Sequence, residues 1–359
     1  MDKAAAKRCV PLTYQPFNCE CSFNRTVRPA TAFPQCVPSA FCRRGRNDAV
    51  RVPLHADSKL SQQTVALESP SSYIIVAGYN ASQVRYWYRA DPFRSYLNAA
   101  RLVTRLVLSL REVGAELPIN LLVSGERHAQ FDALLSRELR VGVIAANESV
   151  RVPRWASDFH LGSFAKLAAL ALVQFRKLVV LDADTLVLRN IDRLVQAPAP
   201  AFVVRFKCFR YFDPLWELNS GVMVLQPDEH ASRTLLDLMN RGGRLSLDGG
   251  PRAQPGSNRS HRALPVEHLG VAGDRGEQSI WRSFYRIAHE LPLRFNALRS
   301  TRFRDARDWA EVSVLHDTDT SRKVPIPHEA LAARYTRLTD AARERVARIA
   351  RSLHIEDRG

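Results

Sequence analysis

Two carboxylates stand one residue apart in this sequence, directly after an apolar run. The run covers residues 178–181 (LVVL), and the acids are Asp182 and Asp184. Such a run predicts a central strand that is covered on both faces. Ligands of open α/β sheets bind beyond the carboxyl ends of the strands, where two acids can reach one divalent cation. As oxygen donors they suit Mg²⁺ or Mn²⁺, although the pair alone is also typical of a solvated turn.

Three further polar groups stand beside predicted strands or helices. The segment 219–221 (NSG) is predicted to form a turn before the apolar strand 222–225. Two acids and an amide precede or open a predicted helix at 276–287, and a histidine follows the predicted strand 312–315. Each group also has a structural explanation, as a capped turn, a helix N-cap or a surface histidine. The side chains concerned are those of Asn219, Ser220, Asp274, Glu277, Gln278 and His316.

The elements that would position these residues alternate between strands and helices. This alternation predicts an α/β class with a mostly parallel central sheet and helices on both faces. In the helix at 160–175, apolar residues recur at helical spacing, so one of its faces should pack on the sheet. Predicted strands cover 73–77, 119–123, 141–145, 178–181, 201–204, 222–225 and 312–315, and predicted helices cover 96–113, 131–139, 160–175, 276–287 and 329–353.

A chain of 359 residues is expected to form one large domain with appendages. We predict an irregular extension containing Cys and Pro over residues 1–68 and the α/β domain over 69–325. Within that domain, residues 241–275 are rich in turn signals and are interpreted as a flexible insertion or lid. Residues 326–359 are expected to contain a C-terminal helix.

The net charge of +16 and the pI near 10.1 suggest anionic partners. The arginines are scattered along the chain, so nucleic acid is not expected as the main partner. No apolar run is long enough for a transmembrane helix, and the first residues lack the apolar core of a signal peptide. A cytoplasmic location is favoured, with the Golgi lumen as the alternative. Either disulfides or reduced thiols would explain the five early cysteines, which are Cys9, Cys19, Cys21, Cys36 and Cys42.

The order and spacing of several motifs resemble glycosyltransferase family 8, the glycogenin-like enzymes. The resemblance covers roughly residues 72–325 and implies a GT-A fold, a UDP-sugar donor, Mn²⁺ (with Mg²⁺ as an alternative) and transfer with retention of configuration. The matching segments are KL at 166–167, DADTLVLRNID at 182–192, LNSGVMVLQP at 218–227, DRGEQ at 274–278, LPLRFNA at 291–297 and VLHD at 314–317.

The resemblance also implies roles for individual residues. It implies that Asp182, Asp184 and His316 hold the metal. It assigns the donor to Asn80, Tyr96, Lys166, Ala183 and Lys323, and the sugar or acceptor to Asn219, Ser220 and Asp274. Tyr96 would stack on uracil, with Tyr86, Trp87 and Tyr88 as rivals in an insertion. Glu277, Gln278 and Lys166 would be catalytic; the other explanation of Lys166 is a lysine that snorkels from an amphipathic helix.

Glu277 stands where many family members have Asp. Retention could proceed through a covalent intermediate on this side chain or through front-face attack beside its carboxylate. The sequence leaves both routes open.

The chain departs from the family pattern after His316, where DTDTSRKVP replaces FxGxxKPW. Lys323 therefore stands one residue late, and Arg322 is its rival for the diphosphate. No tyrosine lies between Asn296 and His316, so glucosylation of the chain by itself is not expected. Another carbohydrate or protein is the expected acceptor, and the oligomeric state is open, with a homodimer as one alternative. A binding protein with weak or no activity is the alternative to an enzyme.

Overall fold

The computed structural model describes residues 26–27, 71–78, 92–124, 129–146, 152, 158–207, 215–240, 276–285, 288–299, 306–317, 325–326 and 328–354. The described helices are α4 (Pro92–Glu112), α5 (Ala129–Leu139), η3 (Asp158–Ala171), η4 (Asp192–Gln196), α6 (Glu229–Asn240), α8 (Gln278–Phe284), η6 (Leu293–Phe295), η7 (Ala306–Glu311) and α9 (Glu329–Ser352). The described strands are β1 (Thr26–Val27), β2 (Ser71–Gly78), β3 (Ile119–Ser124), β4 (Gly142–Ala145), β5 (Lys177–Asp182), β6 (Thr185–Val187), β7 (Ala201–Lys207), β8 (Leu215–Leu225), β9 (Ala288–Leu291), β10 (Ala297–Leu298) and β11 (Val314–His316).

The main sheet has the strand order β1-β9-β7-β8-β5-β2-β3-β4. Strands β2, β3, β4 and β5 pair in parallel, and so do β7 and β9. β8 lies antiparallel between β5 and β7, so these two flanking strands point the same way. The predicted α/β class with a mostly parallel sheet is therefore confirmed. The parallel strands bring their carboxyl ends to one edge, where β5 ends in Asp182.

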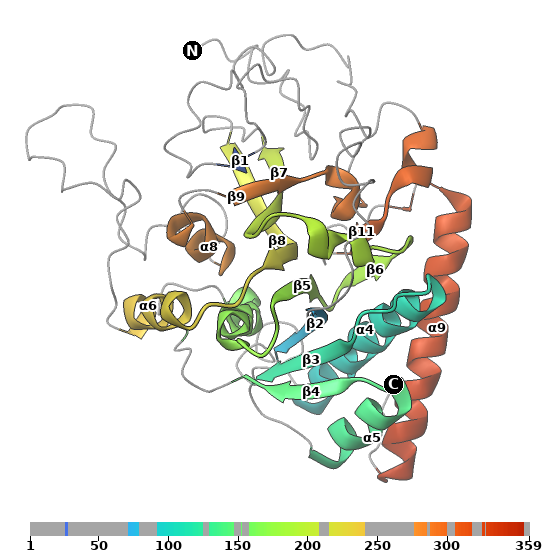
Figure 1. Cartoon of the computed structure of the whole chain (residues 1–359). Coiled ribbons are helices and arrows are strands. Elements are labelled where there is room, and N and C mark those ends of the chain that lie inside the picture. The colour runs from blue at the N-terminus through green and yellow to red at the C-terminus, as the bar shows by residue number, and fades with distance from the viewer. Residues whose placement is uncertain are drawn as a thin grey trace, which may run out of the picture.

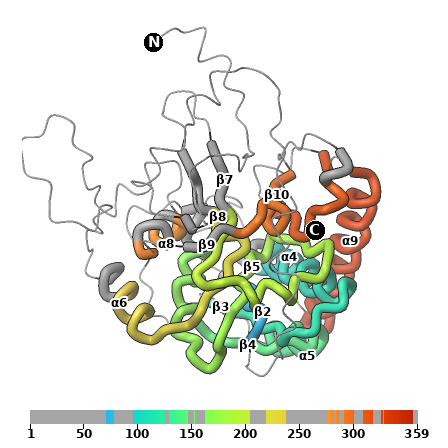
Figure 2. Tube along the Cα trace, turned by 45° about the horizontal axis from the view of Figure 1, so that its top comes forward, coloured from blue at the N-terminus to red at the C-terminus, as the bar shows by residue number. Residues whose placement is uncertain are grey.

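Helices cover both faces of this sheet, as predicted. Figures 1 and 2 show α4, α5 and α9 on one side and α6 and α8 on the other. The first group shares a buried apolar cluster with one face of the strands, and η3, α6 and α8 share a second cluster with the opposite face. Since consecutive strand residues point to opposite faces, the continuous apolar runs of β2 and β5 supply both clusters.

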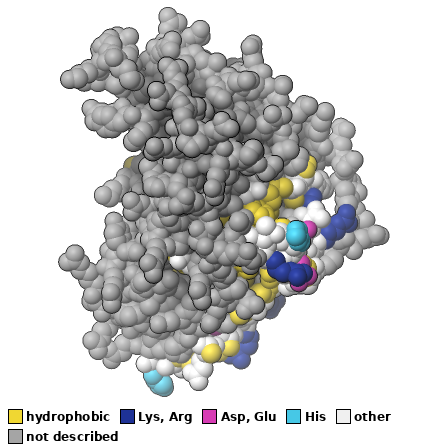
Figure 3. Space-filling view, turned by 90° about the vertical axis from the view of Figure 1, so that its left-hand side faces the viewer, with side chains coloured by type: hydrophobic (Ala, Val, Ile, Leu, Met, Phe, Trp, Pro, Cys, Tyr) yellow, Lys and Arg dark blue, Asp and Glu magenta, His cyan; other side chains and the backbone are white. Residues whose placement is uncertain are grey.

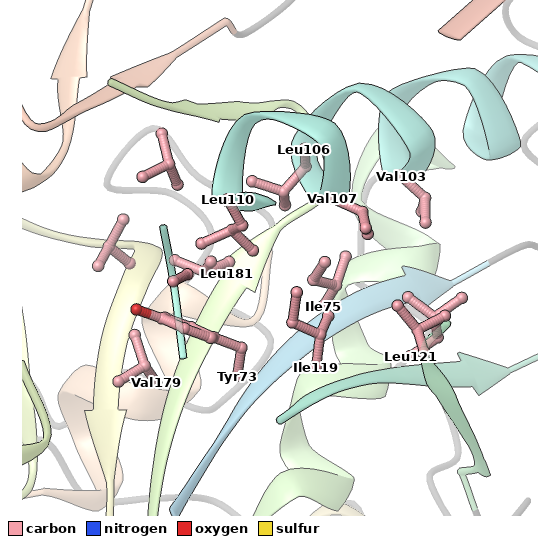
Figure 4. Packing of buried hydrophobic residues seen from close by; sticks show 14 of the residues in the cluster. Tyr73, Ile75, Val103, Leu106, Val107, Leu110, Ile119, Leu121, Val179 and Leu181 are labelled. Carbon is pink, nitrogen blue, oxygen red and sulfur yellow. The ribbon is translucent and has the colours of Figure 1, made fainter. Parts of the chain in front are cut away.

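The long helix α4 packs on the sheet through the apolar residues that its period predicts. Figure 4 shows Val103, Leu106, Val107 and Leu110 of this helix facing side chains of the central strands. All four are at most 2% exposed. Each such side chain contributes about 1.5–3 kcal/mol by leaving water. This apolar face therefore fixes α4 against the strands. It also fixes the position of buried polar residues of α4 such as Arg105.

A second sheet, in the order β10-β11-β6, continues from the acidic pair. β6 begins directly after Asp184, and β11 pairs with it in the antiparallel direction. In this register His316 lies opposite Thr185. A residue far along the chain is thereby placed beside the turn that carries both acids.

The predicted turn at 219–221 was wrong, because these residues lie inside β8. The register of β8 on β7 pairs Met223 with Phe202 and Asn219 with Val203, so residues 220–222 form a bulge. A bulge leaves extra residues unpaired and re-aims their side chains. The polar residues and the glycine interrupt the apolar run without ending the strand.

Two predicted helices also differ from the structure. The helix predicted over 160–175 ends at Ala171 and has 3₁₀ geometry. It is buried from Phe164 to Leu170 without a break, so it does not present one apolar and one solvated face. The helix predicted over 276–287 spans only Gln278–Phe284.

Several predicted segments lie outside the described residues. They include the extension 1–68 apart from β1, all five early cysteines and the insertion 241–275. Among the helices that the structure describes, none combines the length and apolar character needed to cross a membrane.

Candidate functional site

Asp182, Asp184 and His316 converge at the carboxyl end of β5. One ligand atom of each lies within 4.8 Å of the others. His316 Nε2 is 3.2 Å from an oxygen of Asp184 and 3.9 Å from one of Asp182. The pairing of β11 with β6 causes this approach, since it places His316 opposite the residue that follows Asp184. The three residues predicted to share an ion are therefore together.

The imidazole of His316 is oriented by a chain of amides. Its Nδ1 lies 2.8 Å from the side-chain oxygen of Asn296, which can only accept a hydrogen bond. Nδ1 therefore carries a proton, and Nε2 is the ring nitrogen that faces the two acids. Asn296 in turn donates to the side-chain oxygen of Asn219, which also accepts the backbone N–H of Gly221 at 2.9 Å. This amide chain holds the ring with its ligand atom toward Asp182 and Asp184.

The donor set fits a divalent cation. Two adjacent carboxylates repel each other, and a cation at the point where they meet relieves that repulsion. Burial of Asp182 and the neighbouring Asp184 carboxylate raise the pKa of Asp182 above its usual range, although Lys166 opposes the shift. Oxygen ligands with one imidazole suit Mn²⁺ and also Mg²⁺. Asp182, Asp184 and His316 would hold such an ion.

Lys166 is buried beside this cluster and does not snorkel to solvent. It is 2% exposed, and its Nζ lies 2.6 Å from Asp182 and 2.7 Å from Glu277. The same Nζ donates to the hydroxyl of Ser220 at 3.0 Å. Burial lowers the pKa of Lys166, but the two carboxylates more than offset this, so the pKa lies above its ordinary value. Lys166 is therefore a charged ammonium that joins the acidic pair to Glu277.

Glu277 is buried at the start of α8 and does not cap the helix. It occupies the N-cap position, yet its side chain makes no capping hydrogen bond. Its Oε1 accepts from Lys166 and, at 2.5 Å, from Ser220, while Oε2 accepts from Ser163. Burial alone would raise the pKa of Glu277, but the Lys166 charge and these hydrogen bonds hold it below the usual range. The carboxylate is thus ionised and directed at Lys166.

The bulge in β8 brings Ser220 and Gln278 into the same network. The backbone N–H of Ser220 donates to Gln278 Oε1 at 3.1 Å, while the Ser220 hydroxyl bonds to Glu277. The side-chain oxygen of Asn219 accepts hydrogen bonds from Asn296 and from the backbone of Gly221, and the predicted sugar contact of Asn219 stays a prediction. The bulge thus links the ring of His316 to the start of α8.

Only some of the predicted donor-binding residues lie in the part of the chain that the structure describes. Ala183 lies between the two acids and is partly exposed. Tyr96 is buried on α4, where its hydroxyl donates to Asp132 and its ring meets Phe131 edge-on at 5.4 Å. Asn80, Asp274 and Lys323 lie outside the described residues, together with Arg322, Tyr86, Trp87 and Tyr88.

Sequence reasoning gave no role to Asn296 or Ser163, although both join the site. Asn296 lies within the segment LPLRFNA, which belongs to the family resemblance, but the segment does not show which of its side chains faces His316. Ser163 lies three residues before Lys166 in η3, and this spacing places both on one side of a helix with three residues per turn. That spacing was the available signal.

Charged side chains of both signs are visible on one face of the molecule. On the face shown in Figure 3, the basic side chains of the described residues lie close to acidic ones.

Parts of the chain are similar in sequence to known proteins. Residues 96–199 match a family model described as "Mannosyltransferase putative". The chain is 35% identical over 179 residues to glycogenin-1 of Caenorhabditis elegans, covering 48% of this chain and 39% of that protein. It is 40% identical over 130 residues to glycogenin-1 of Homo sapiens, covering 36% of this chain and 34% of that protein. The chain thus spans well under half the length of these relatives.

Among solved structures, the chain is similar to the galactosyltransferase LgtC in complex with donor and acceptor sugar analogues. The sequence identity is 15% and the TM-score is 0.44. The match covers 76% of this chain and 95% of that one.

Proposed function

We propose that the chain is a glycogenin-like glycosyltransferase with the GT-A fold, and that it transfers a hexose from a UDP-sugar to an acceptor hydroxyl with retention of configuration. Its identity of 35% and 40% to two glycogenins over part of its length supports this proposal. The convergence of Asp182, Asp184 and His316 carries this proposal. Mn²⁺ is the proposed ion, with Mg²⁺ as the alternative. Glucose or galactose is the proposed sugar class, and a carbohydrate or another protein is the proposed acceptor.

The acidic pair and the histidine would anchor the diphosphate of the donor. A bound divalent ion would supply Lewis-acid stabilisation of the charge that builds on the departing UDP. Lys166 adds a fixed ammonium beside the acids, where a point charge favours the same developing negative charge. Ala183 would let the donor approach between the two acids, since its methyl group is small.

We propose that Glu277 acts near the anomeric carbon of the bound sugar. Its two oxygens accept hydrogen bonds from Lys166, Ser220 and Ser163. A carboxylate engaged in this way is a weaker nucleophile than a free one, because its lone pairs are already committed. This arrangement supports front-face attack, with Glu277 stabilising the positive charge of an oxocarbenium-like state, over a covalent intermediate.

The direct test is a panel of UDP-sugars, including UDP-glucose and UDP-galactose, scored for Mn²⁺-dependent release of UDP. Water can replace the acceptor in this assay, so the acceptor need not be known. We expect release with at least one sugar and its loss in Asp184→Asn. Asp192→Asn is the matched control: Asp192 accepts from Tyr73 and from the backbone of Glu116, not from the acidic site.

Three outcomes separate the candidate functions. Release that disappears only in Asp184→Asn supports the transferase. A thermal melt that shows protection by UDP-sugar without any turnover supports a binding protein. Retention on heparin that falls with salt, without protection by any UDP-sugar, supports a polyanion-binding protein.

A further inference from the structure

A second buried polar cluster lies directly behind the candidate metal centre. Its centre is Asp317, which is fully buried. One carboxylate oxygen lies 3.1 Å from Arg105 and accepts the hydroxyl of Tyr335 at 2.5 Å. The other oxygen lies 2.7 Å from Nε of Arg299. These four side chains form the Asp317 cluster, and none of them was assigned a role in the reaction above.

The Asp317 cluster joins segments that are far apart in the sequence. Arg105 comes from α4, Asp317 and Arg299 follow β11 and β10, and Tyr335 comes from the C-terminal helix α9. The Tyr335 ring has the guanidinium of Arg105 at 4.6 Å and that of Arg299 at 4.2 Å from its centroid. Such cation–π contacts and the shared carboxylate hold α9 against this part of the fold.

The cluster is connected to two of the candidate metal ligands through the backbone. The N–H of Asp317 donates to the backbone oxygen of Asp184 at 2.9 Å, and Arg105 reaches the same oxygen at 3.4 Å. Asp317 also directly follows His316 in the chain. A movement of Asp317 therefore shifts the backbone of both Asp184 and His316.

We propose that the Asp317 cluster positions Asp184 and His316 for the metal, and that the C-terminal helix takes part through the hydroxyl of Tyr335. This inference rests on the metal role given in the proposed function. Tyr335 is a positioning residue, because its effect passes through Asp317. The C-terminal helix is then a part of the site and not an appendage to it.

Tyr335→Phe is the variant that tests this role. It removes one hydroxyl and keeps the ring that both guanidiniums contact, whereas removing Asp317 would leave two buried arginines without their carboxylate. Tyr73→Phe is the matched control. The Tyr73 hydroxyl also donates to a carboxylate, that of Asp192 at 2.7 Å, but the other partners of Asp192 are the backbone of Glu116 and the side chain of Asn190. Both variants therefore lose the same kind of hydrogen bond.

Electron paramagnetic resonance of the free ion measures Mn²⁺ binding to the full chain without nucleotide. A thermal melt measures the stability of each variant. Outer-shell partners of metal ligands typically change affinity by about 10- to 100-fold, and a partner one step further out should give at least about a threefold loss. We expect Tyr335→Phe to weaken Mn²⁺ binding by this factor and Tyr73→Phe to leave it unchanged. Both should lower the melting temperature.

The outcomes separate this inference from the function it rests on. If Tyr335→Phe bound Mn²⁺ with the same affinity as the wild type, the positioning role would be overturned. The proposed metal centre would be unaffected by that result. Equal losses in Tyr335→Phe and Tyr73→Phe would also overturn it, because the effect would then be one of general stability. Wild-type protein that binds no Mn²⁺ would overturn the metal centre and this inference together.

Discussion

Gly221 is the residue at which the smallest change should do the most damage to the metal centre. A Cβ at this position would lie 2.4 Å from Cε1 and 2.5 Å from Nδ1 of His316, and 3.0 Å from the side-chain oxygen of Asn219. Ordinary carbon–carbon contacts are about 3.5–4.0 Å, so the imidazole would have to move by about 1 Å. The hydrogen bond to Asn296 opposes that movement, because it fixes Nδ1.

Gly221→Ala is therefore expected to displace the metal-binding nitrogen. A displacement of about 1 Å in a catalytic group can cost about 100-fold in rate. Overpacking of a buried site should also lower the free energy of unfolding by about 1–3 kcal/mol. We expect Mn²⁺-dependent UDP release to fall about 100-fold and Mn²⁺ affinity to fall with it. Calorimetric titration of Mn²⁺ and the UDP-release assay measure the two effects separately.

Gly142→Ala provides a control with a similar clash elsewhere. A Cβ there would lie 2.0 Å from the side-chain oxygen of Asn120, whose amide nitrogen donates to the hydroxyl of Ser72 near the start of β2. This variant should lose stability and keep its Mn²⁺ affinity. If Gly221→Ala instead bound Mn²⁺ and released UDP like the wild type, the close packing of Gly221 on His316 would have no functional meaning and our reasoning would be refuted.

Three further variants test the contacts of Lys166 and of His316. Glu277→Gln keeps the size of the side chain and removes its charge, so turnover should fall far more than UDP affinity; near-normal turnover would reduce Glu277 to a structural residue. Lys166→Met leaves the buried carboxylate of Glu277 and the partly exposed carboxylate of Asp182 without their cation, and should lower the free energy of unfolding by about 3–5 kcal/mol, measured by urea titration. That loss should be smaller by about 0.5–3 kcal/mol when Glu277→Gln is already present, and strict additivity in the cycle would show that the two charges are independent. Asn296→Ala should weaken Mn²⁺ binding by about tenfold through the freed ring of His316, a loss that calorimetry would detect and that an unchanged affinity would disprove.

The main features of the fold could be predicted from the sequence because they depend on local patterns. Apolar runs of strand length gave β2, β3 and β5, and the helical period of α4 correctly gave its buried face. The antiparallel β8 was not predicted, because an apolar run does not show its direction. The bulge at 220–222 was interpreted as a turn, since polar residues and a glycine are typical of both.

The residues of the site also divide into those that the sequence could place and those that it could not. Asp182 and Asp184 could be placed from the strand that precedes them, and His316 from the family resemblance. The partners of His316 could not, because Asn296 and Gly221 reach it through sheet pairings that no local pattern encodes. The Asp317 cluster needed the structure for the same reason: Arg105 and Tyr335 are ordinary helix residues in the sequence, and only the packing of α4 and α9 brings them to Asp317.

The central claim is that Asp182, Asp184 and His316 bind one ion, and anomalous diffraction from a crystal soaked in Mn²⁺ and UDP tests it most directly. We predict a single manganese peak coordinated by both carboxylates and by Nε2 of His316, with diphosphate oxygens completing the shell. A map with UDP bound but no manganese at these three side chains, or with His316 turned away from the acids, would contradict the account.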